Sequence, residues 1–496
     1  MKKRLFLIAF AAAAFGTQVR AQFDETNNLF YHTLRTPQST LYNPAFFPTN
    51  NTIYFMLPGF DLQFGSPLAM NDIIRYDKTT ETTVVDLSHM LQSLNENNQF
   101  RLGANVNILG FGMKIKSIYF NVHTRLVNNV SLGLPISTVN ALVEGNVDSD
   151  GETKSVVDIV NGDILNATSY LETGVGAAYE IEPLHLTVGL RAKLLYGIAN
   201  VQTDNTKVVV NTDPNLDSVS ASIYYDVQSA TFAPYDTSQH SFIVKFGDLL
   251  NLGKANTGLA FDLGAKYEMG PFTFSVALND LSAGIHWKNN VTSWSPESGP
   301  GVITFSGLDV NSMLENGSFS TDSIATLLRE KLNGMTPTRI DTGDYWYSIP
   351  TKINIGASYS FAKIFRAGLL LHGQFDRGLL CKSPENKLGI DVDNSNTFRF
   401  NTTLTFGANL FNWAEVIVGS SVVYDGSKMD FFNPGFGLVL TPATFAQLYV
   451  MTDYISSFYL TESKAFNVKL GLNLLFGKGQ RTKVVEVEEV PLDMEP

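Results

Sequence analysis

The chain has 496 residues, of which 17% are charged and 12% are aromatic, and its formal net charge is −12. Ordinary globular proteins carry about 25% charged residues. The acidic balance argues against a nucleic-acid partner, because neutralising phosphates requires clusters of Lys and Arg. The single cysteine, Cys381, excludes an internal disulfide framework and a cysteine-based zinc site.

Residues 1–21 have the pattern of a secretory signal peptide. Lys2, Lys3 and Arg4 precede an apolar stretch, and a small-residue cleavage site ends at Ala21. The stretch is too short to cross a membrane as a helix, and no later apolar run reaches the necessary length. We expect cleavage after Ala21 and export to the outer membrane of a Gram-negative envelope.

Residues 22–51 precede the first strand-like segment and contain the sequence Asn43-Pro44-Ala45. An Asn-Pro pair often simply opens a turn. Directly after this segment, the apolar phase of residues 53–64 changes at Pro58-Gly59. Pro cannot donate to a strand ladder and Gly permits a bulge, so the pair predicts a strand end or a kink in the wall.

Apolar and polar residues alternate along most of the chain. In the last such segment, Phe466 and Leu470 share one face, whereas Asn467 and Lys469 share the other. Segments of about 10 to 17 residues are long enough to cross a bilayer at a tilt. We predict an all-β fold, a transmembrane antiparallel β-barrel of about fourteen strands formed by residues 52–476. The predicted strands are 52–64, 99–115, 118–130, 168–181, 184–200, 256–269, 272–288, 349–361, 364–376, 397–411, 414–425, 431–441, 445–459 and 466–476.

Short and long connections alternate between these strands, as in bacterial outer-membrane barrels, where the short turns face the periplasm. Lys116-Ser117 and Gly270-Pro271 are short connections, whereas 201–255 and 289–348 are long. Spacing of apolar residues by three and four predicts short helices inside the loops. The predicted loop helices are 84–94, 135–143 and 320–332.

Several segments resemble known barrel families. The Asn-Pro-Ala segment resembles the N-terminal hatch of FadL-type fatty-acid transporters and of the type IX secretion shuttle barrels of Bacteroidota. Residues 258–287 are similar to a hairpin of those barrels, and residues 97–111 and 134–146 resemble a less characterised Bacteroidota family of the same architecture. The resemblance implies a hatch or plug at residues 22–51 and uptake of a small hydrophobic ligand. It also implies a gap at Pro58-Gly59, although the kink of FadL-type barrels lies in a later strand.

Charged residues of both signs are predicted to face the lumen. Mixed signs favour pairing within a filled interior over a selectivity filter of one sign. The residues are Arg191, Lys193, Asp262, Lys266, Glu268, Lys352, Arg366 and Arg399.

Catalytic and metal-binding motifs are missing from the sequence, so we predict neither an enzyme nor a cofactor. Residues 146–151 begin like a calcium loop, but Val157 replaces the bidentate Glu, so no metal site is predicted. Ser218 and Ser323 lie in three-residue segments that resemble the O-glycan acceptor of Bacteroidota, and motifs this short also occur by chance.

Residues 477–496 are basic at the start of the segment and acidic at its end, which predicts a solvated periplasmic tail or a short docking peptide. The aromatic Phe476 that ends the last strand resembles the signal read by the barrel-assembly machinery.

Three functions remain open. A FadL-like transporter would bind outer-membrane lipid and a hydrophobic small molecule, and it predicts an apolar pocket under the hatch. A component of secretion or surface assembly would use the long loops to dock its partners. A structural barrel would engage periplasmic partners through the tail.

Overall fold

The computed structural model describes residues 29–33, 35–48, 51–77, 81–94, 97–144, 156–161, 164–213, 218–231, 235–236, 241–242, 256–296, 301–306, 314–315, 318–319, 338–362, 364–375, 398–410, 413–424, 429–443, 445–454 and 464–477. Four predictions lie outside these residues: the signal peptide, the loop helix at 320–332, the acceptor Ser323 and the tail beyond Gly477.

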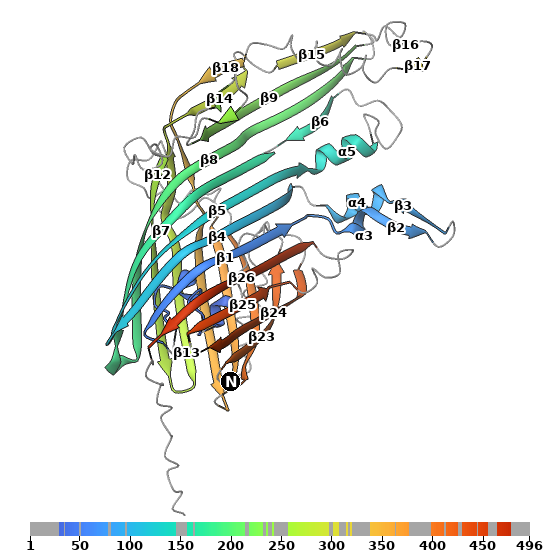
Figure 1. Ribbon diagram of the computed structural model, residues 1–496. Helices are drawn as coiled ribbons and strands as arrows, with labels where there is room; N and C mark the ends of the chain where they lie inside the picture. Colours follow the sequence, from blue (N-terminus) through green and yellow to red (C-terminus); the bar gives the residue numbers. More distant parts are fainter. Residues whose placement is uncertain are drawn as a thin grey trace, which may run out of the picture.

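Fourteen antiparallel strands close into a barrel (Figure 1), which confirms the predicted fold class. Each strand pairs with the next along the chain, and β1 closes the cylinder by pairing with both β4 and β26. The barrel strands are β1 (Ile53–Gly65), β4 (Asn97–Ile115), β5 (Ile118–Pro135), β7 (Leu165–Ile181), β8 (Leu186–Asp213), β12 (Asn256–Met269), β13 (Phe272–Trp287), β20 (Thr351–Phe361), β21 (Phe365–Phe375), β22 (Phe398–Leu410), β23 (Ala414–Tyr424), β24 (Met429–Ala443), β25 (Ala446–Thr452) and β26 (Ala465–Phe476).

One end of the barrel carries the tight connections, and we call it the turn end. Lys116, Gly270 and Ala362 have positive φ angles of 53°, 57° and 48° in the turns after β4, β12 and β20. Such left-handed residues match the twist of the strands that they join. β1 begins and β26 ends here, since Ile53 pairs with Phe476.

Strands also continue beyond the opposite, loop end. β8 runs to Asp213, well past the end near residue 200 that the sequence pattern predicts. Residues 203–210 show no alternation, and this part of β8 is held by pairing with β6 and β9. Paired with β8 and its neighbours are β6 (Val156–Asn161), β9 (Ser218–Thr231), β14 (Val291–Pro296), β15 (Gly301–Ser306), β18 (Thr338–Asp341) and β19 (Tyr345–Ser348). These strands form an extended sheet above the barrel (Figure 1).

Short elements fill the other connections. Two of the predicted loop helices are present as α4 and α5, although residues 84–85 belong to a strand. The short elements are α3 (Met70–Ile73), β2 (Ile74–Asp77), β3 (Thr82–Val85), α4 (Leu87–Ser93), α5 (Ile136–Glu144), η2 (Glu182–Leu184), β10 (Tyr235–Asp236), β11 (Ser241–Phe242), β16 (Leu314–Glu315) and β17 (Ser318–Phe319).

The barrel wall is apolar outside and polar inside. Leu404 and Val175 are 64% and 63% exposed on the outer surface, whereas Arg191 and Asp262 are fully buried within. This is the reverse of a soluble protein, and it is the distribution expected when lipid surrounds the cylinder. Among the described helices, none combines the length and apolar character needed to cross a membrane.

Candidate functional site

The N-terminal segment occupies the barrel lumen. It comprises residues 29–33 and 35–48, which we call the plug, and contains η1 (Phe30–His32) and α2 (Ser39–Tyr42). Its apolar side chains pack against inward-facing wall residues: Phe30 contacts Tyr449, and Phe47 stacks on Tyr119 with ring centroids 5.1 Å apart. Nearly every plug residue is buried, so the plug and the wall share one core.

The Asn43-Pro44-Ala45 motif forms a turn that rests on the wall. Asn43 Oδ1 accepts a hydrogen bond from the Ala45 amide at 2.9 Å, as in an Asx turn. Its Nδ2 donates to the carbonyl of Val276 on β13 at 3.3 Å. A Cβ atom on Gly264 would lie 2.2 Å from Asn43 Oδ1, so this turn requires a wall residue without a side chain.

Arg191 ties the plug to the wall. The guanidinium lies 3.1 Å from a carboxylate oxygen of Asp262 and donates to the plug carbonyls of Thr40 and Leu41. Arg191 and Asp262 are both fully buried. A buried guanidinium is costly unless its donors are satisfied, and the plug carbonyls satisfy part of that requirement. The sequence predicts both residues in the lumen, but not the contact with the plug.

Lys193 joins three carboxylates into one buried network. Its Nζ lies 2.9 Å from Asp262, 2.8 Å from Asp280 and 3.7 Å from Glu172. Glu172 in turn accepts from His123 and faces Arg125 at 3.1 Å. The signs in this network are mixed and its groups are paired.

The strand β13 is distorted where Asp280 meets this network. Its register with β12 shifts twice, between Leu278 and Leu281 and between Leu281 and Gly284. Asp280 and Ser282 have φ angles of 60° and 54°, which non-glycine residues rarely adopt. The Asp280 amide leaves the ladder and donates to Asp262 Oδ1 at 2.9 Å. We call residues 279–283 the β13 bulge.

The β13 bulge also interrupts pairing on its other side. β13 pairs with β20 as far as Asn279 opposite Lys352, and it resumes with β19 at Gly284 opposite Ser348. The hydrogen bonds between them include one from Thr351 Oγ1 to the Asp280 carbonyl and one from the Ile349 amide to the Ala283 carbonyl. Left-handed backbone angles at two non-glycine residues are not needed for a plain barrel strand, so the bulge marks a candidate functional position.

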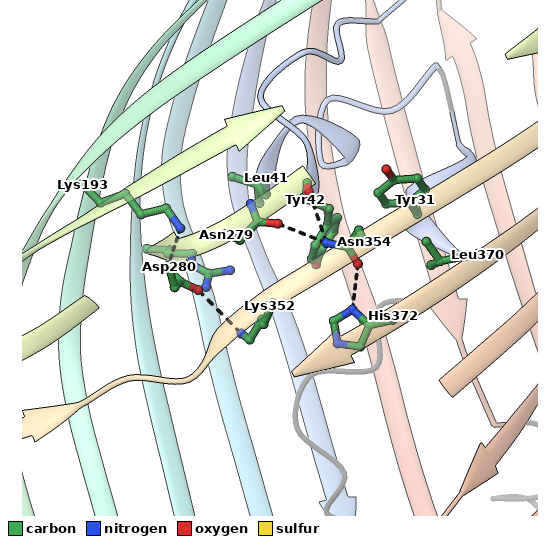
Figure 2. A pocket seen from close by; sticks show the side chains of 11 residues that line it. Tyr31, Leu41, Tyr42, Lys193, Asn279, Asp280, Lys352, Asn354, Leu370 and His372 are labelled. Atoms are coloured by element: carbon green, nitrogen blue, oxygen red, sulfur yellow. Dashed lines mark hydrogen bonds and ion pairs between the residues drawn. The ribbon is translucent and has the colours of Figure 1, made fainter. Parts of the chain in front are cut away.

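A small cavity lies between the β13 bulge and the plug (Figure 2), with a volume of about 20 Å³. Figure 2 shows Lys193, Asp280 and Lys352 joined by ion pairs at the cavity. Asn279, Asn354 and His372 form a second group, in which the Asn354 side chain is hydrogen-bonded to both of the others. The amide nitrogen of Asn279 is buried and makes no hydrogen bond to any residue that the structure describes. The plug contributes Tyr31, Leu41 and Tyr42, and the other two lining residues are Arg125 and Leu370.

This cavity is more polar than the apolar pocket that a FadL-type hatch leads us to expect. Its apolar part comes from the plug and from Leu370, whereas the wall supplies charges and amides. At this volume the cavity has room for about one water molecule, so a molecule with an apolar body would need the plug to move and its polar end to face β13 and β20.

The other predicted lumen charges lie elsewhere. Lys266 pairs with Glu268 at 3.2 Å near the turn end, and both side chains are partly exposed. Arg366 donates to the plug carbonyl of His32 at 2.7 Å and faces Glu415. For Arg399 and Ser218 only the backbone is described, in β22 and at the start of β9.

Pro58 and Gly59 form a different irregularity. The register of β1 with β26 shifts between Met56 and Gly59, while its register with β4 stays continuous. Tyr449 fills the inner side, since a Cβ on Gly59 would lie 2.5 Å from its hydroxyl oxygen. No β1 residue lines the cavity described above.

Sequence reasoning missed Asp280 and Asn279. The available signal was the run Asn279-Asp280-Leu281-Ser282 inside an otherwise regular strand pattern, because Asn and Asp tolerate left-handed backbone angles and favour turns. The described residues contain no group of three or more His, Cys, Asp and Glu side chains placed to hold a metal ion.

Burial sets the protonation of two plug residues. It lowers the pKa of the His32 imidazole to about 3, and the neighbouring Arg366 guanidinium acts in the same direction. Burial also raises the pKa of the Tyr31 hydroxyl to about 12, against smaller effects of hydrogen bonds to Ser275 and Asn43. Both residues are therefore neutral near pH 7.

Fold and site together define the class of protein: a closed antiparallel β-barrel with an apolar outer wall, plugged by its own N-terminal segment. The chain belongs to the family of unknown function DUF5723, whose model matches residues 44–453. No curated protein matches the chain in sequence.

Solved structures with a similar fold include transporters and a translocator. The toluene transporter TodX of P. putida is 8% identical, with 89% of this chain and 91% of that chain covered and a TM-score of 0.37. A Pseudomonas aeruginosa FadL homologue is 9% identical (89% and 94% covered, TM-score 0.38), and the translocator domain of the autotransporter NalP from Neisseria meningitidis is 5% identical (86% and 89%, TM-score 0.29). No conclusion about function follows from likenesses of this size.

Proposed function

We propose that the protein is an outer-membrane barrel that binds or takes up a small hydrophobic molecule with one polar end. The membrane assignment is supported by the outer wall, on which residues such as Leu404 and Leu259 are more than half exposed around a closed barrel. The signal-like residues 1–21 agree with export through the inner membrane.

The residues that line the cavity are the reason for proposing a polar end on the ligand. Lys193 and Lys352 bring two ammonium groups to its wall, and the unbonded amide nitrogen of buried Asn279 lies beside them. Buried donors are normally satisfied, so an acceptor such as a carbonyl, hydroxyl or carboxylate oxygen would complete this arrangement. Tyr31, Leu41 and Leu370 would contact the apolar body.

The β13 bulge supports a route through the wall, and this observation carries the proposal. The bulge separates the cavity from the lipid-facing surface, where Leu259 and Phe261 of β12 are 58% and 41% exposed. Here the regular ladder of β13 is replaced by irregular hydrogen bonds, which include those from Thr351 Oγ1 and the Ile349 amide. A molecule in the cavity would therefore leave sideways at lower cost here than through a regular ladder.

Native mass spectrometry of the barrel purified from whole membranes tests the proposal. We expect a co-purifying small molecule in the parent, and at least a tenfold lower occupancy after Asn279→Leu or Lys352→Met. Lys266→Met is the matched control, since it removes a lumen cation that does not line the cavity. An empty parent, or equal occupancy in all variants, would reject ligand binding at this cavity.

A second function is supported by the sheet beyond the loop end. β8, β9, β14, β15 and β18 project as a paired surface beyond the barrel (Figure 1), which suits an anchor for secretion or surface assembly. We expect a variant with residues 204–226 replaced by a short turn to keep its ligand and to lose release of exported cargo. Normal cargo release in that variant would exclude this function.

A further inference from the structure

A hairpin unit on the outside of the barrel presents an apolar face that the fold leaves uncovered. It consists of α3, β2, β3 and α4, residues 70–77 and 81–93, which we call the lateral hairpin. Figure 1 shows it projecting sideways from the loop ends of β1 and β26, away from the barrel axis. The Ser66 amide donates to the Lys464 carbonyl at 2.7 Å, and Asp72 pairs with Lys464, which fixes its base to β26.

One side of the lateral hairpin is already packed. Ile73, Met90 and Leu91 contact a buried cluster with Leu68, Leu94 and Val139 beside α5. This cluster holds the unit against α5 and the end of β5. The apolar residues on the other side belong to none of the hydrophobic clusters found among the described residues.

The uncovered side is an amphipathic strand pair. Ile74 pairs with Val85 and Tyr76 with Thr83, so these four side chains share one face, while Arg75 lies on the other. Tyr76 and Val85 are 58% and 62% exposed. An isolated two-stranded ribbon is at best marginally stable in water, so a covering surface would stabilise it. The exposed large apolar residues of the whole lateral hairpin are Met70, Ile74, Tyr76, Val84, Val85 and Leu87, and Val84 lies on the same face as its partner Arg75.

The apolar outer wall runs directly into this unit. Phe60, Leu62 and Phe64 of β1 are nearly half exposed in the lipid-facing surface. Phe64 pairs with Leu102 on β4 and Phe466 on β26, so the apolar surface spans three strands there. Met70 follows six residues later, which limits its distance from Phe64 to about 20 Å. The lateral hairpin thus begins at the edge of the surface that lipid covers.

We propose that the lateral hairpin lies on the outer leaflet, with Ile74, Tyr76 and Val85 inserted at the boundary between headgroups and acyl chains. Lipid is favoured over a protein partner because the exposed face continues the lipid-facing wall. A tyrosine with an apolar ring and a polar hydroxyl suits this depth. Such a contact would fix the tilt of the barrel around β1 and β26, which are the strands beside the hairpin. The inference is independent of the proposed ligand.

Collision accessibility of a nitroxide label tests the proposal in full-length barrels, one per phosphatidylcholine nanodisc. Cys381 is the only cysteine, so the background is Cys381→Ser and the label is placed by Tyr76→Cys or, as a second site, Val85→Cys. Leu404→Cys on the outer wall is the lipid control. Val302→Cys on β15, 48% exposed, is the water control.

We expect both hairpin labels to resemble the Leu404 label. Compared with the Val302 label, collisions with oxygen should be at least threefold more frequent. Collisions with a water-soluble nickel chelate should be at least threefold less frequent. Labels that resemble Val302 would overturn the proposal, since the face would then be in water. Labels shielded from both reagents would also overturn it, since a protein surface would then cover the face.

Discussion

Lys193 Nζ lies 2.8 Å from the carboxylate of Asp280 and thereby links β8 to the bulge of β13, two strands away. The same ammonium also contacts Asp262 on the strand between them. Three consecutive wall strands therefore meet at one buried cation beside the plug. This arrangement couples the shape of the wall at β13 to the charges that hold the plug.

The plug should loosen when its buried cation is removed. Arg191→Met deletes the ion pair with Asp262 and two hydrogen bonds to plug carbonyls, at a cost of about 3 kcal/mol. In planar bilayers we expect open-channel events in the variant and a closed parent. Lys266→Met, which removes a partly exposed pair, should stay closed. A closed Arg191→Met barrel would show that other contacts suffice.

The plug turn should be displaced by a single methyl group. In Gly264→Ala the new carbon would lie 2.2 Å from Asn43 Oδ1 and 2.8 Å from a ring carbon of Pro44. Overpacking of this kind costs about 1–3 kcal/mol, so hydrogen exchange of residues 38–48 should accelerate roughly 5- to 100-fold. Gly103→Ala is the matched control, because its nearest neighbour would be 3.5 Å away. Equal exchange in the two variants would contradict the close approach.

The β13 bulge should tolerate glycine better than a β-branched residue at position 280. The φ angle of 60° at Asp280 is accessible to Gly, whereas Val in this conformation is strained by about 1–2 kcal/mol. We expect Asp280→Val to unfold at a lower temperature than Asp280→Gly, although both lose the contact with Lys193. The midpoint of heat-induced gel mobility change measures this difference. The reverse order would mean that the backbone of β13 is not left-handed there.

Docking of the plug should weaken at acidic pH because of His32. Its pKa is about 3 in the docked plug and 6.5 in water, so the undocked state binds the additional proton. The contribution of His32 is complete above pH 6.5 and declines as the pH falls toward 3, by about 2 kcal/mol at pH 5. Hydrogen exchange of residues 29–48, corrected for the intrinsic pH effect, should rise at pH 5. His32→Leu should lose most of this rise, and a variant that keeps it would assign the effect to another group.

The barrel was predictable from the sequence because alternation has a single physical cause. Apolar and polar residues, such as Leu470 and Lys469, alternate wherever one face of a strand contacts lipid and the other faces the lumen. Beyond the membrane that cause disappears, so the two-residue period does not predict the continuation of β8 to Asp213.

The site was only partly predictable. Strand phase places Arg191, Lys193 and Asp262 in the lumen, but not the plug carbonyls that Arg191 binds, since those come from residues about 150 positions away. The β13 bulge depends on backbone angles at Asp280 and Ser282 that a two-residue period cannot encode.

Gel mobility of the outer-membrane fraction tests the central claim, that this chain is a closed barrel in lipid, most directly. A closed hydrogen-bonded cylinder resists detergent until it is heated, so the protein should sediment with outer membranes and shift between unheated and boiled samples. Recovery in the aqueous fraction, with the same mobility before and after boiling, would contradict the account.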